Sequence, residues 1–314
     1  MLSYRGGVVA IFAVLICFCC NACRAFHMAT SVRASRSWTM METGRNLKLD
    51  VEGGYLSYDV FYPKGASARD PAIVYLPGLV REKNEAKSIN LQALCKKSDM
   101  TFLSADYYGV GRSSGKFSDG SITRWTQDAI NLIDTALKPA AANKVILVGH
   151  GLGAWISFLI ALQRPDLVSG IVGVSADPDF TEELLWKTLP EDVKTKIMDD
   201  GVYEITWGTE KYPITRNLIE DGRKNMLLTG LPGSLPIQCP VRLLHAQEDE
   251  EVPSSMAMKL LDNCASQDAY IVLMKNAKHA MDGDRELKAL RNLITDVIDS
   301  KKSQQFDLRT PGSG

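Results

Sequence analysis

The sequence predicts an α/β protein built on a doubly wound, mostly parallel sheet, and three observations carry this prediction. Short, continuously apolar runs recur along the chain, and helical patterns separate them. Strands that are buried on both faces of a parallel sheet have this continuous apolar character. The alternation of strand and helix implies right-handed crossovers and helices on both faces. With 314 residues, 45% of them apolar, the chain is long enough for one main domain with a small insertion.

A β-hairpin is expected first, because residues 46–51 and 55–63 alternate in the manner of strands and meet at Gly53 and Gly54. The apolar runs that follow are expected to be parallel strands, at residues 72–78, 101–106, 144–150, 168–177, 241–249 and 269–279. Helical patterns lie between or after them, at residues 87–97, 122–137, 152–163, 254–261 and 285–298.

The interval 178–238 interrupts this alternation with an unusually long crossover. Two amphipathic stretches in it, residues 179–201 and 214–236, are expected to be helical. Such an insertion is either a lid that opens over a binding site or a covering helical layer without a gating role. The main domain is expected over residues 43–300 and includes this insertion, and a flexible tail is expected at 301–314.

Residues 1–42 are expected to be a leader outside the fold. Val8 to Cys20 form an unbroken apolar run behind Arg5, as in a signal peptide, but the run is shorter than the roughly 18 residues that a spanning helix needs. No acidic residue precedes Glu42, and the arginines are interleaved with serines, as in an organellar transit peptide. We therefore expect a mitochondrial location, with the secretory pathway as the alternative.

Composition excludes several functional classes. The formal net charge of −1 argues against a nucleic-acid-binding surface or a polybasic membrane patch. Outside the leader the cysteines are scattered, and no C-x-x-C pair occurs among Cys95, Cys239 and Cys264. No disulfide framework, zinc site or redox motif is therefore expected, and no cofactor or metal is implied. No nucleic-acid partner and no stable membrane span are expected.

The most informative segment runs from Lys144 to Ala161, where a buried strand, a glycine-rich turn and an apolar helix follow one another. The turn reads G-H-G-L-G over Gly149–Gly153. In many hydrolytic enzymes this strand, turn and helix carry G-x-S-x-G, whose central serine attacks a carbonyl from a strained elbow. Gly151 stands at the central position and offers no oxygen or sulfur for attack. The sequence therefore predicts a nucleophile elbow without its nucleophile.

An acid and a base stand where a Ser-His-Asp triad of this fold requires them. Ligands of open α/β sheets bind beyond the carboxyl ends of the strands, and the chain order of the triad is nucleophile, acid, histidine. Asp249 and His279 end the last two apolar runs. We expect Asp249 to orient the imidazole of His279, and His279 to relay a proton. The backbone amides of Leu79 and Leu152 are the expected oxyanion-hole donors.

The other three histidines are expected to lie outside this chemistry. His245 lies inside an apolar strand and is expected to be a hydrogen-bonded core group. His150 occupies the first variable position of the elbow, points away from the nucleophile position, and is expected to be structural. His27 falls in the leader.

Three further residues are candidate substitutes for parts of the triad. Ser175 ends the strand beside the elbow, but the amides of the expected oxyanion hole would be misdirected for its attack. Asp177, beyond the same strand, is an alternative acid for His279 and supplies no hydroxyl. Cys95 falls on a predicted helix and is expected in the core.

Longer blocks of the sequence resemble the family of abhydrolase domain-containing protein ten. The similar blocks are "YLPGLV", "ADYYGVGRSSGKFSDGSITRWTQDAI", "ILVGHGLGAW", "RPDLVSGIVGVSADPDFTEELL", "CPVRLLHAQEDEEVP" and "NAKHAMDGD". The resemblance covers residues 47–298 and implies an α/β-hydrolase fold with a helical lid. It also implies a mitochondrial serine hydrolase that cleaves palmitoyl-protein thioesters and acyl glucuronides through an acyl-enzyme. The implied partners are small acyl esters, thioesters or S-acylated proteins. The family's acid and base fall on Asp249 and His279, its hole donors on Leu79 and Leu152, and its serine on Gly151.

Without its serine, such a hydrolase is expected to be strongly impaired or inactive. Two alternatives stay open. One is a non-catalytic pseudoenzyme that binds acyl or ester ligands, and the other is a dyad of His279 and Asp249 that works without an acyl-enzyme. The elbow itself is expected to persist, because a side-chain-bearing residue there costs about 1–3 kcal/mol of backbone strain that glycine relieves.

Overall fold

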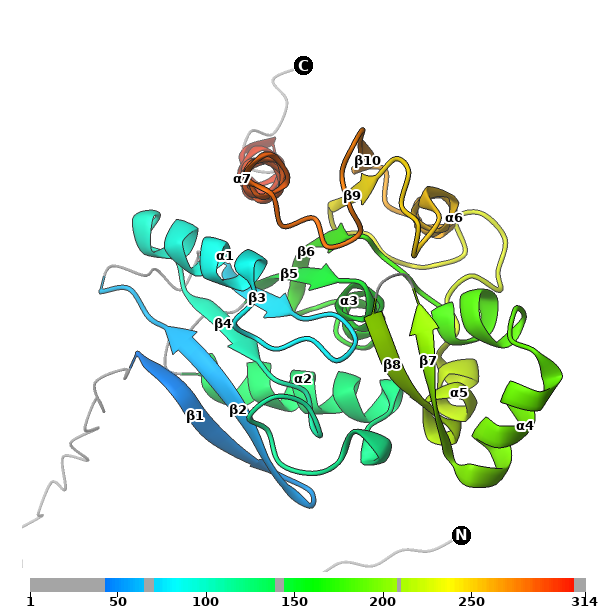
Figure 1. The fold of residues 1–314 in the computed structure, drawn as a ribbon. Helices are drawn as coiled ribbons and strands as arrows, with labels where there is room; N and C mark the ends of the chain where they lie inside the picture. Colours follow the sequence, from blue (N-terminus) through cyan, green and yellow to red (C-terminus); the bar gives the residue numbers. More distant parts are fainter. Residues whose placement is uncertain (1–42, 65–70, 139–143, 208–209, 308–314) are drawn as a thin grey trace, which may run out of the picture. The chain divides into compact units, whose positions relative to one another are not determined.

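The computed structural model describes residues 43–64, 71–138, 144–207 and 210–307. The expected leader at 1–42 and the end of the expected tail, 308–314, lie outside the described residues. Figure 1 shows the described part as a central sheet with helices packed on both of its faces. The predicted doubly wound α/β architecture is confirmed.

One eight-stranded sheet forms the centre of the fold. Its strands are β1 (Gly44–Val51), β2 (Gly54–Phe61), β3 (Ala72–Leu76), β4 (Phe102–Ala105), β5 (Val145–His150), β6 (Val168–Val174), β9 (Val241–Ala246) and β10 (Ala269–Met274). They lie in the order β1-β2-β4-β3-β5-β6-β9-β10. β1 and β2 form the predicted hairpin, β2 also pairs antiparallel with β4, and the other neighbours are parallel. Every residue of β3, β5, β6 and β9 is buried, as their apolar runs predicted.

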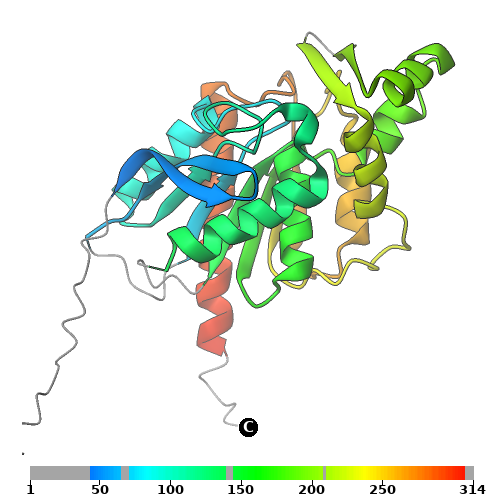
Figure 2. The same cartoon turned by 90° about the horizontal axis from the view of Figure 1, so that it is seen from below.

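The faces of the sheet are covered by α1 (Ala86–Lys97), α2 (Ile122–Ala136), α3 (Leu152–Gln163), α6 (Ser254–Asn263) and α7 (Asp284–Asp307). α1 and α7 pack on one face, and α2 and α3 pack on the other (Figure 2). Alternate side chains of β5 serve the two cores, because Leu147 packs with α2 and α3 while Val148 packs with α1 and α7. α7 continues to Asp307, past the predicted domain boundary at residue 300.

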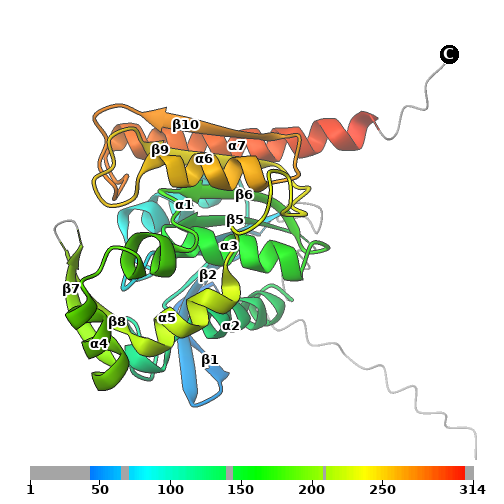
Figure 3. The ribbon, with the colours of Figure 1, turned by 90° about the vertical axis from the view of Figure 1, so that its right-hand side faces the viewer.

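The insertion at 178–238 differs from the two long helices that we expected. Its helical segments are short, namely a π-helical turn (Thr181–Trp186), α4 (Glu191–Asp200), α5 (Arg216–Gly222) and a 3-10 turn (Arg223–Asn225). An antiparallel hairpin of β7 (Val202–Trp207) and β8 (Glu210–Thr215) lies between α4 and α5. Pro190 precedes α4 and cannot continue the first helical segment, and Gly201, with φ 84°, ends α4. Figure 3 shows β7, β8, α4 and α5 grouped together beside the sheet.

The parallel strands of the sheet end at one common edge, and this positions the site. The residues that follow β5, β9 and β10 therefore come together although they are far apart in the sequence. In the described part of the chain, no helix combines the length and the apolar character that a membrane crossing requires.

Candidate active site

The turn between β5 and α3 has the backbone geometry of a nucleophile elbow. Gly151 has φ 50° and ψ −119°, a conformation that a residue with a side chain adopts only under strain. A Cβ atom on Gly153 would lie 2.0 Å from the carbonyl oxygen of Leu76, so only glycine allows α3 to approach β3 this closely. A Cβ atom on Gly151 would instead meet Asp177 Oδ2 at 3.3 Å as its nearest neighbour. A small side chain at Gly151 would therefore fit only if Asp177 shifted by a few tenths of an ångström.

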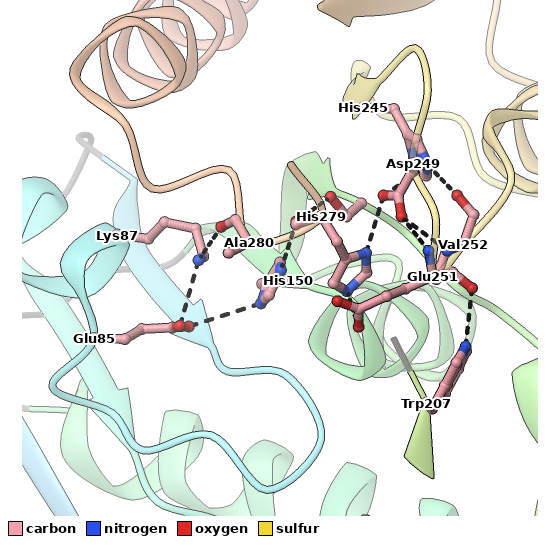
Figure 4. Close-up of polar contacts among 11 residues, drawn as sticks. Glu85, Lys87, His150, Trp207, His245, Asp249, Glu251, Val252, His279 and Ala280 are labelled. Atoms are coloured by element: carbon pink, nitrogen blue, oxygen red, sulfur yellow. Dashed lines mark hydrogen bonds and ion pairs between the residues drawn. The ribbon is translucent and has the colours of Figure 1, made fainter. Parts of the chain in front are cut away.

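Asp249 and His279 form a hydrogen-bonded acid–base pair beside this elbow (Figure 4). His279 Nδ1 lies 3.0 Å from Asp249 Oδ2, and the backbone amides of Glu251 and Val252 each donate to Asp249 Oδ1 at 2.9 Å. Burial raises the pKa of Asp249, but the hydrogen bonds from His279 and the two amides outweigh it, so this pKa lies below its usual value. Asp249 is therefore an anionic acceptor, His279 Nδ1 is the donor, and Nε2 is left for other chemistry.

The backbone of the His279 loop is fixed from three sides. Ser175 Oγ donates to the carbonyl oxygen of His279 at 2.7 Å, and His150 Nε2 lies 3.4 Å from the same oxygen. Lys87 Nζ donates to the neighbouring carbonyl oxygen of Ala280 at 2.7 Å. These contacts restrict the position of the imidazole relative to the elbow.

His245 is a buried core group, as predicted, and it also contacts the acid. Its Nε2 lies 2.9 Å from the carbonyl oxygen of Val252 and 3.5 Å from Asp249 Oδ2. Since a carbonyl oxygen can only accept, Nε2 carries the hydrogen. Burial lowers the pKa of His245, so the ring is neutral near pH 7. The sequence did not predict its contact with Asp249.

His150 is also buried, and its ring centroid lies 5.3 Å from that of His279. Burial, followed by the charges of Lys87 and His279, holds the pKa of His150 well below its usual value. A neutral His150 thus packs beside the base and supports its loop, which agrees with the structural role predicted for it.

A cavity of about 20 Å³ joins the predicted site residues. Its lining consists of Gly78, Leu79, Arg81, His150, Gly151, Asp177, Trp207, Tyr212, Glu251 and His279. The cavity thus brings together Gly151, His279 and one predicted oxyanion-hole residue, Leu79. Leu152, the other, begins α3 beside Gly151, and Asp249 lies behind His279. Among the described residues, neither the Leu79 amide nor the Leu152 amide has a hydrogen-bond acceptor.

The predicted substitutes for triad members have other environments. Ser175 is buried, and its hydroxyl donates to the His279 loop rather than facing a ligand. His279 Nδ1 pairs with Asp249, so Asp177 does not take the acid position. Cys95 is buried in α1, as predicted, and burial raises the pKa of its thiol to about 12.

Sequence reasoning missed the aromatic side of the site. Trp207, at the end of β7, donates from Nε1 to the carbonyl oxygen of Glu251 at 3.0 Å and stacks on Phe180 with ring centroids 5.5 Å apart. Tyr212 in β8 packs edge-on against Trp207, and both rings line the cavity. A signal was present, because β-branched and aromatic residues are frequent in 202–207 and 211–215. In the described residues, no cluster of three or more His, Cys, Asp or Glu side chains is arranged to hold a metal ion.

Comparisons with known proteins identify relatives over much of the chain. A family model described as serine aminopeptidase, S33, matches residues 70–205. The palmitoyl-protein thioesterase ABHD10, mitochondrial, of Bos taurus is 30% identical over 239 residues, covering 75% of this chain and 76% of that protein. The Homo sapiens protein of the same name is 28% identical over 239 residues, with the same shares covered. The monoglyceride lipase of Mus musculus is 25% identical over 244 residues, covering 69% of this chain and 77% of the lipase.

Solved structures have the same fold. The alpha/beta hydrolase domain-containing protein 10 from mouse matches with a TM-score of 0.70 at 25% identity, covering 81% of this chain and 98% of that one. Est1E from Butyrivibrio proteoclasticus matches with a TM-score of 0.65 at 20% identity, covering 83% and 99%. At 20% identity the second likeness concerns the fold alone.

Proposed function

The chain belongs to the α/β-hydrolase family of ABHD10, and from this premise we propose that it binds acyl esters and thioesters at the Gly151 elbow and hydrolyses them only weakly. The observation that carries the proposal is the 3.0 Å contact between His279 Nδ1 and Asp249, beside the cavity that Gly151 lines. A carboxylate at Nδ1 holds the imidazole in the tautomer that accepts a proton at Nε2. The acid, the base and the hole amides support ligand binding and proton transfer, while the attacking side chain is missing.

The missing hydroxyl sets the size of the expected defect. In serine proteases, removing the nucleophile lowers kcat by about 10⁶ and leaves roughly 10³–10⁴ over the uncatalysed reaction from the hole and substrate binding. A 10⁶-fold lower kcat corresponds to an activation free energy that is about 8 kcal/mol higher. We expect a reduction in kcat of the same order here, so the natural chain should turn over substrate far more slowly than an intact serine hydrolase.

The ligand class and the compartment follow from the relatives. Because ABHD10 relatives are named palmitoyl-protein thioesterases, we propose a small acyl ester, an acyl thioester or an S-acylated protein as the ligand. Because they are named mitochondrial, we propose the mitochondrion rather than the secretory pathway. A cavity of about 20 Å³ has no room for a long acyl chain. Binding a palmitoyl group would therefore require the β7–β8 hairpin to move, which makes the insertion a lid in this proposal.

Restoring the serine tests this function. We expect Gly151→Ser to react with a fluorophosphonate probe and to hydrolyse a p-nitrophenyl ester and an acyl thioester at least about 10³-fold faster than the natural chain. The double variant Gly151→Ser with His279→Ala is the matched control and is expected to lose this gain. The natural chain is expected to bind a non-hydrolysable thioether analogue with an affinity similar to that of Gly151→Ser.

Three outcomes would count against the proposal. No gain on reversion would mean that Asp249, His279 or the hole is not competent. Strong labelling of the natural chain by the fluorophosphonate would mean that another residue serves as the nucleophile. Analogue binding without any turnover by the natural chain would favour the non-catalytic pseudoenzyme.

A further inference from the structure

Asp177 places a buried carboxyl group directly opposite the missing side chain. It follows β6, is 5% exposed, and its Oδ2 lies 3.3 Å from the position of a Cβ atom on Gly151. Its other oxygen, Oδ1, is buried and has no hydrogen-bond partner among the described residues. A buried polar atom without a partner is costly, so its environment calls for a ligand oxygen or a water molecule.

The cavity in front of Asp177 has the size of a single water molecule. A buried water needs about 10–15 Å³ of probe-sized space and two to four polar partners. The cavity measures about 20 Å³ and is lined by both Asp177 and His279. Since His279 Nδ1 is bonded to Asp249, Nε2 is the ring nitrogen that can accept a proton from an oxygen in this space, and it lies 4.0 Å from Glu251 Oε2.

The surroundings of the cavity favour the protonated form of Asp177, and burial is the main cause. Burial, together with the negative charges of Asp249 and Glu251, raises the pKa of Asp177 well above its usual value. A protonated carboxyl group can donate one hydrogen bond and accept another. It can therefore hold a neutral water without repelling the electron pair that the water must use in an attack.

We propose that one water molecule occupies the space of the missing serine hydroxyl, held between Asp177 and His279, and that this water attacks the acyl carbonyl directly. Asp177 thereby becomes a catalytic residue, because it contacts the attacking oxygen. The proposal rests on the proposed function, since an ester or thioester must first bind with its carbonyl oxygen at the Leu79 and Leu152 amides.

In this proposal water hydrolyses the ester or thioester directly, and no acyl-enzyme forms. The water oxygen forms a bond to the carbonyl carbon while His279 Nε2 takes one of its protons, and the carbonyl electron pair moves to the oxygen in the hole. The carbonyl then re-forms, and the bond to the ester oxygen or thioester sulfur breaks. His279 returns the proton to this leaving group, so the products are a carboxylic acid and an alcohol or thiol.

Filling the space is the first test, with a p-nitrophenyl ester as the probe. Gly151→Ala adds only a methyl group where the water would stand, so we expect its kcat to fall at least tenfold below that of the natural chain. Gly233→Ala is the matched control, because Gly233 also has a positive φ, of 76°, and a Cβ atom there meets nothing within 4 Å. We expect Gly233→Ala to keep the turnover of the natural chain.

Substituting Asp177 is the second test, because it separates a neutral hydrogen-bonding group from a negative charge. We expect Asp177→Asn, which keeps a donor and an acceptor, to lower kcat by about threefold or less. Asp177→Val, which has neither, is expected to lower it at least tenfold. Both variants should bind the thioether analogue like the natural chain. The natural chain should show no pre-steady-state burst and no covalent adduct by intact mass.

Several results would overturn the water mechanism. One is a Gly151→Ala variant with the same kcat as the natural chain, and another is a His279→Ala variant that keeps the natural turnover. An acyl adduct on the natural chain, or equal losses of kcat in Asp177→Asn and Asp177→Val, would also overturn it. If Gly151→Ser still gains hydrolysis in such a case, the proposed function stands and only the water mechanism fails. If Gly151→Ser gains nothing, the proposed function fails as well.

Discussion

Lys87 Nζ donates a hydrogen bond at 2.7 Å to the carbonyl oxygen of Ala280, which lies 193 positions further along the chain. Lys87 is 1% exposed, and its ammonium also lies 3.3 Å from Glu85 Oε2 (Figure 4). Glu85 in turn accepts a hydrogen bond from the hydroxyl of Tyr75 in β3. The loop that carries the base is thus anchored to α1, which precedes the elbow in sequence and contributes neither the acid, the base nor an oxyanion-hole amide.

Lys87→Met should loosen this anchor while filling the same space. The variant loses the hydrogen bond to Ala280 and removes the positive charge that pairs with the Glu85 carboxylate. We therefore expect it to lower the free energy of unfolding by about 1–3 kcal/mol. In the Gly151→Ser background it should lower kcat more than it raises KM, because the position of His279 suffers rather than ligand binding. Urea unfolding and steady-state kinetics measure the two effects. A variant with normal kcat would contradict the anchoring role.

Gly151→Ser should cost stability even as it restores chemistry. A serine must adopt φ 50° and bring its Cβ to 3.3 Å from Asp177 Oδ2, so we expect a loss of about 1–3 kcal/mol in the free energy of unfolding. Gly233→Ser is the matched control for the positive φ alone, because nothing lies within 4 Å of its Cβ position. Urea denaturation compares the two. A Gly151→Ser variant more stable than the natural chain would show that the elbow carries no strain.

Trp207→Ala should change which acyl chains the site accepts. The indole lines the small cavity and is held by the carbonyl oxygen of Glu251 and by the ring of Phe180, so its removal opens space beside His279. In the Gly151→Ser background we expect the ratio of kcat/KM for octanoyl over acetyl p-nitrophenyl esters to rise about tenfold. Trp207→Phe keeps a ring and should leave the ratio near its starting value. An unchanged ratio in Trp207→Ala would place the chain path elsewhere.

Asp179 should make stability depend on pH. Its two carboxylate oxygens accept from the amides of Leu227 and Leu228 at 2.7 Å each, while burial raises its pKa to about 6. A folded-state pKa above the unfolded value of 3.8 means that this group contributes stability at low pH, and the contribution is lost as the pH rises through about 6. Between pH 5 and 7 the natural chain should therefore lose about 1 kcal/mol more than Asp179→Asn. Urea unfolding of both proteins at the two pH values checks this, and parallel profiles would refute it.

The sheet was predictable because each buried strand has its own local signal. The largely apolar runs of β5 and β6 and the glycine pair between β1 and β2 do not depend on distant residues. The insertion was not predictable in the same way. The hairpin of β7 and β8 pairs only with itself and is partly exposed, so its alternating pattern is weak beside the flanking amphipathic helices.

The candidate site shows the same division. Asp249 and His279 were predictable because topology alone brings the carboxyl ends of β9 and β10 to the elbow. The contacts of Lys87 with Ala280 and of Trp207 with Glu251 were not, since each joins side chain and backbone across separate elements. No local pattern encodes such contacts, because they depend on how the loops pack once the sheet has formed.

The left-handed backbone at Gly151 also bears on how this protein can be engineered. The elbow keeps its backbone conformation without a side chain at Gly151, so the geometry that would position a nucleophile remains although the nucleophile is absent. One substitution at this position, rather than a rebuilt loop, is then enough to restore an attacking group. A cysteine or a serine at this position would place sulfur or oxygen in one shared frame, and their intrinsic reactivities toward the same acyl group could be compared directly.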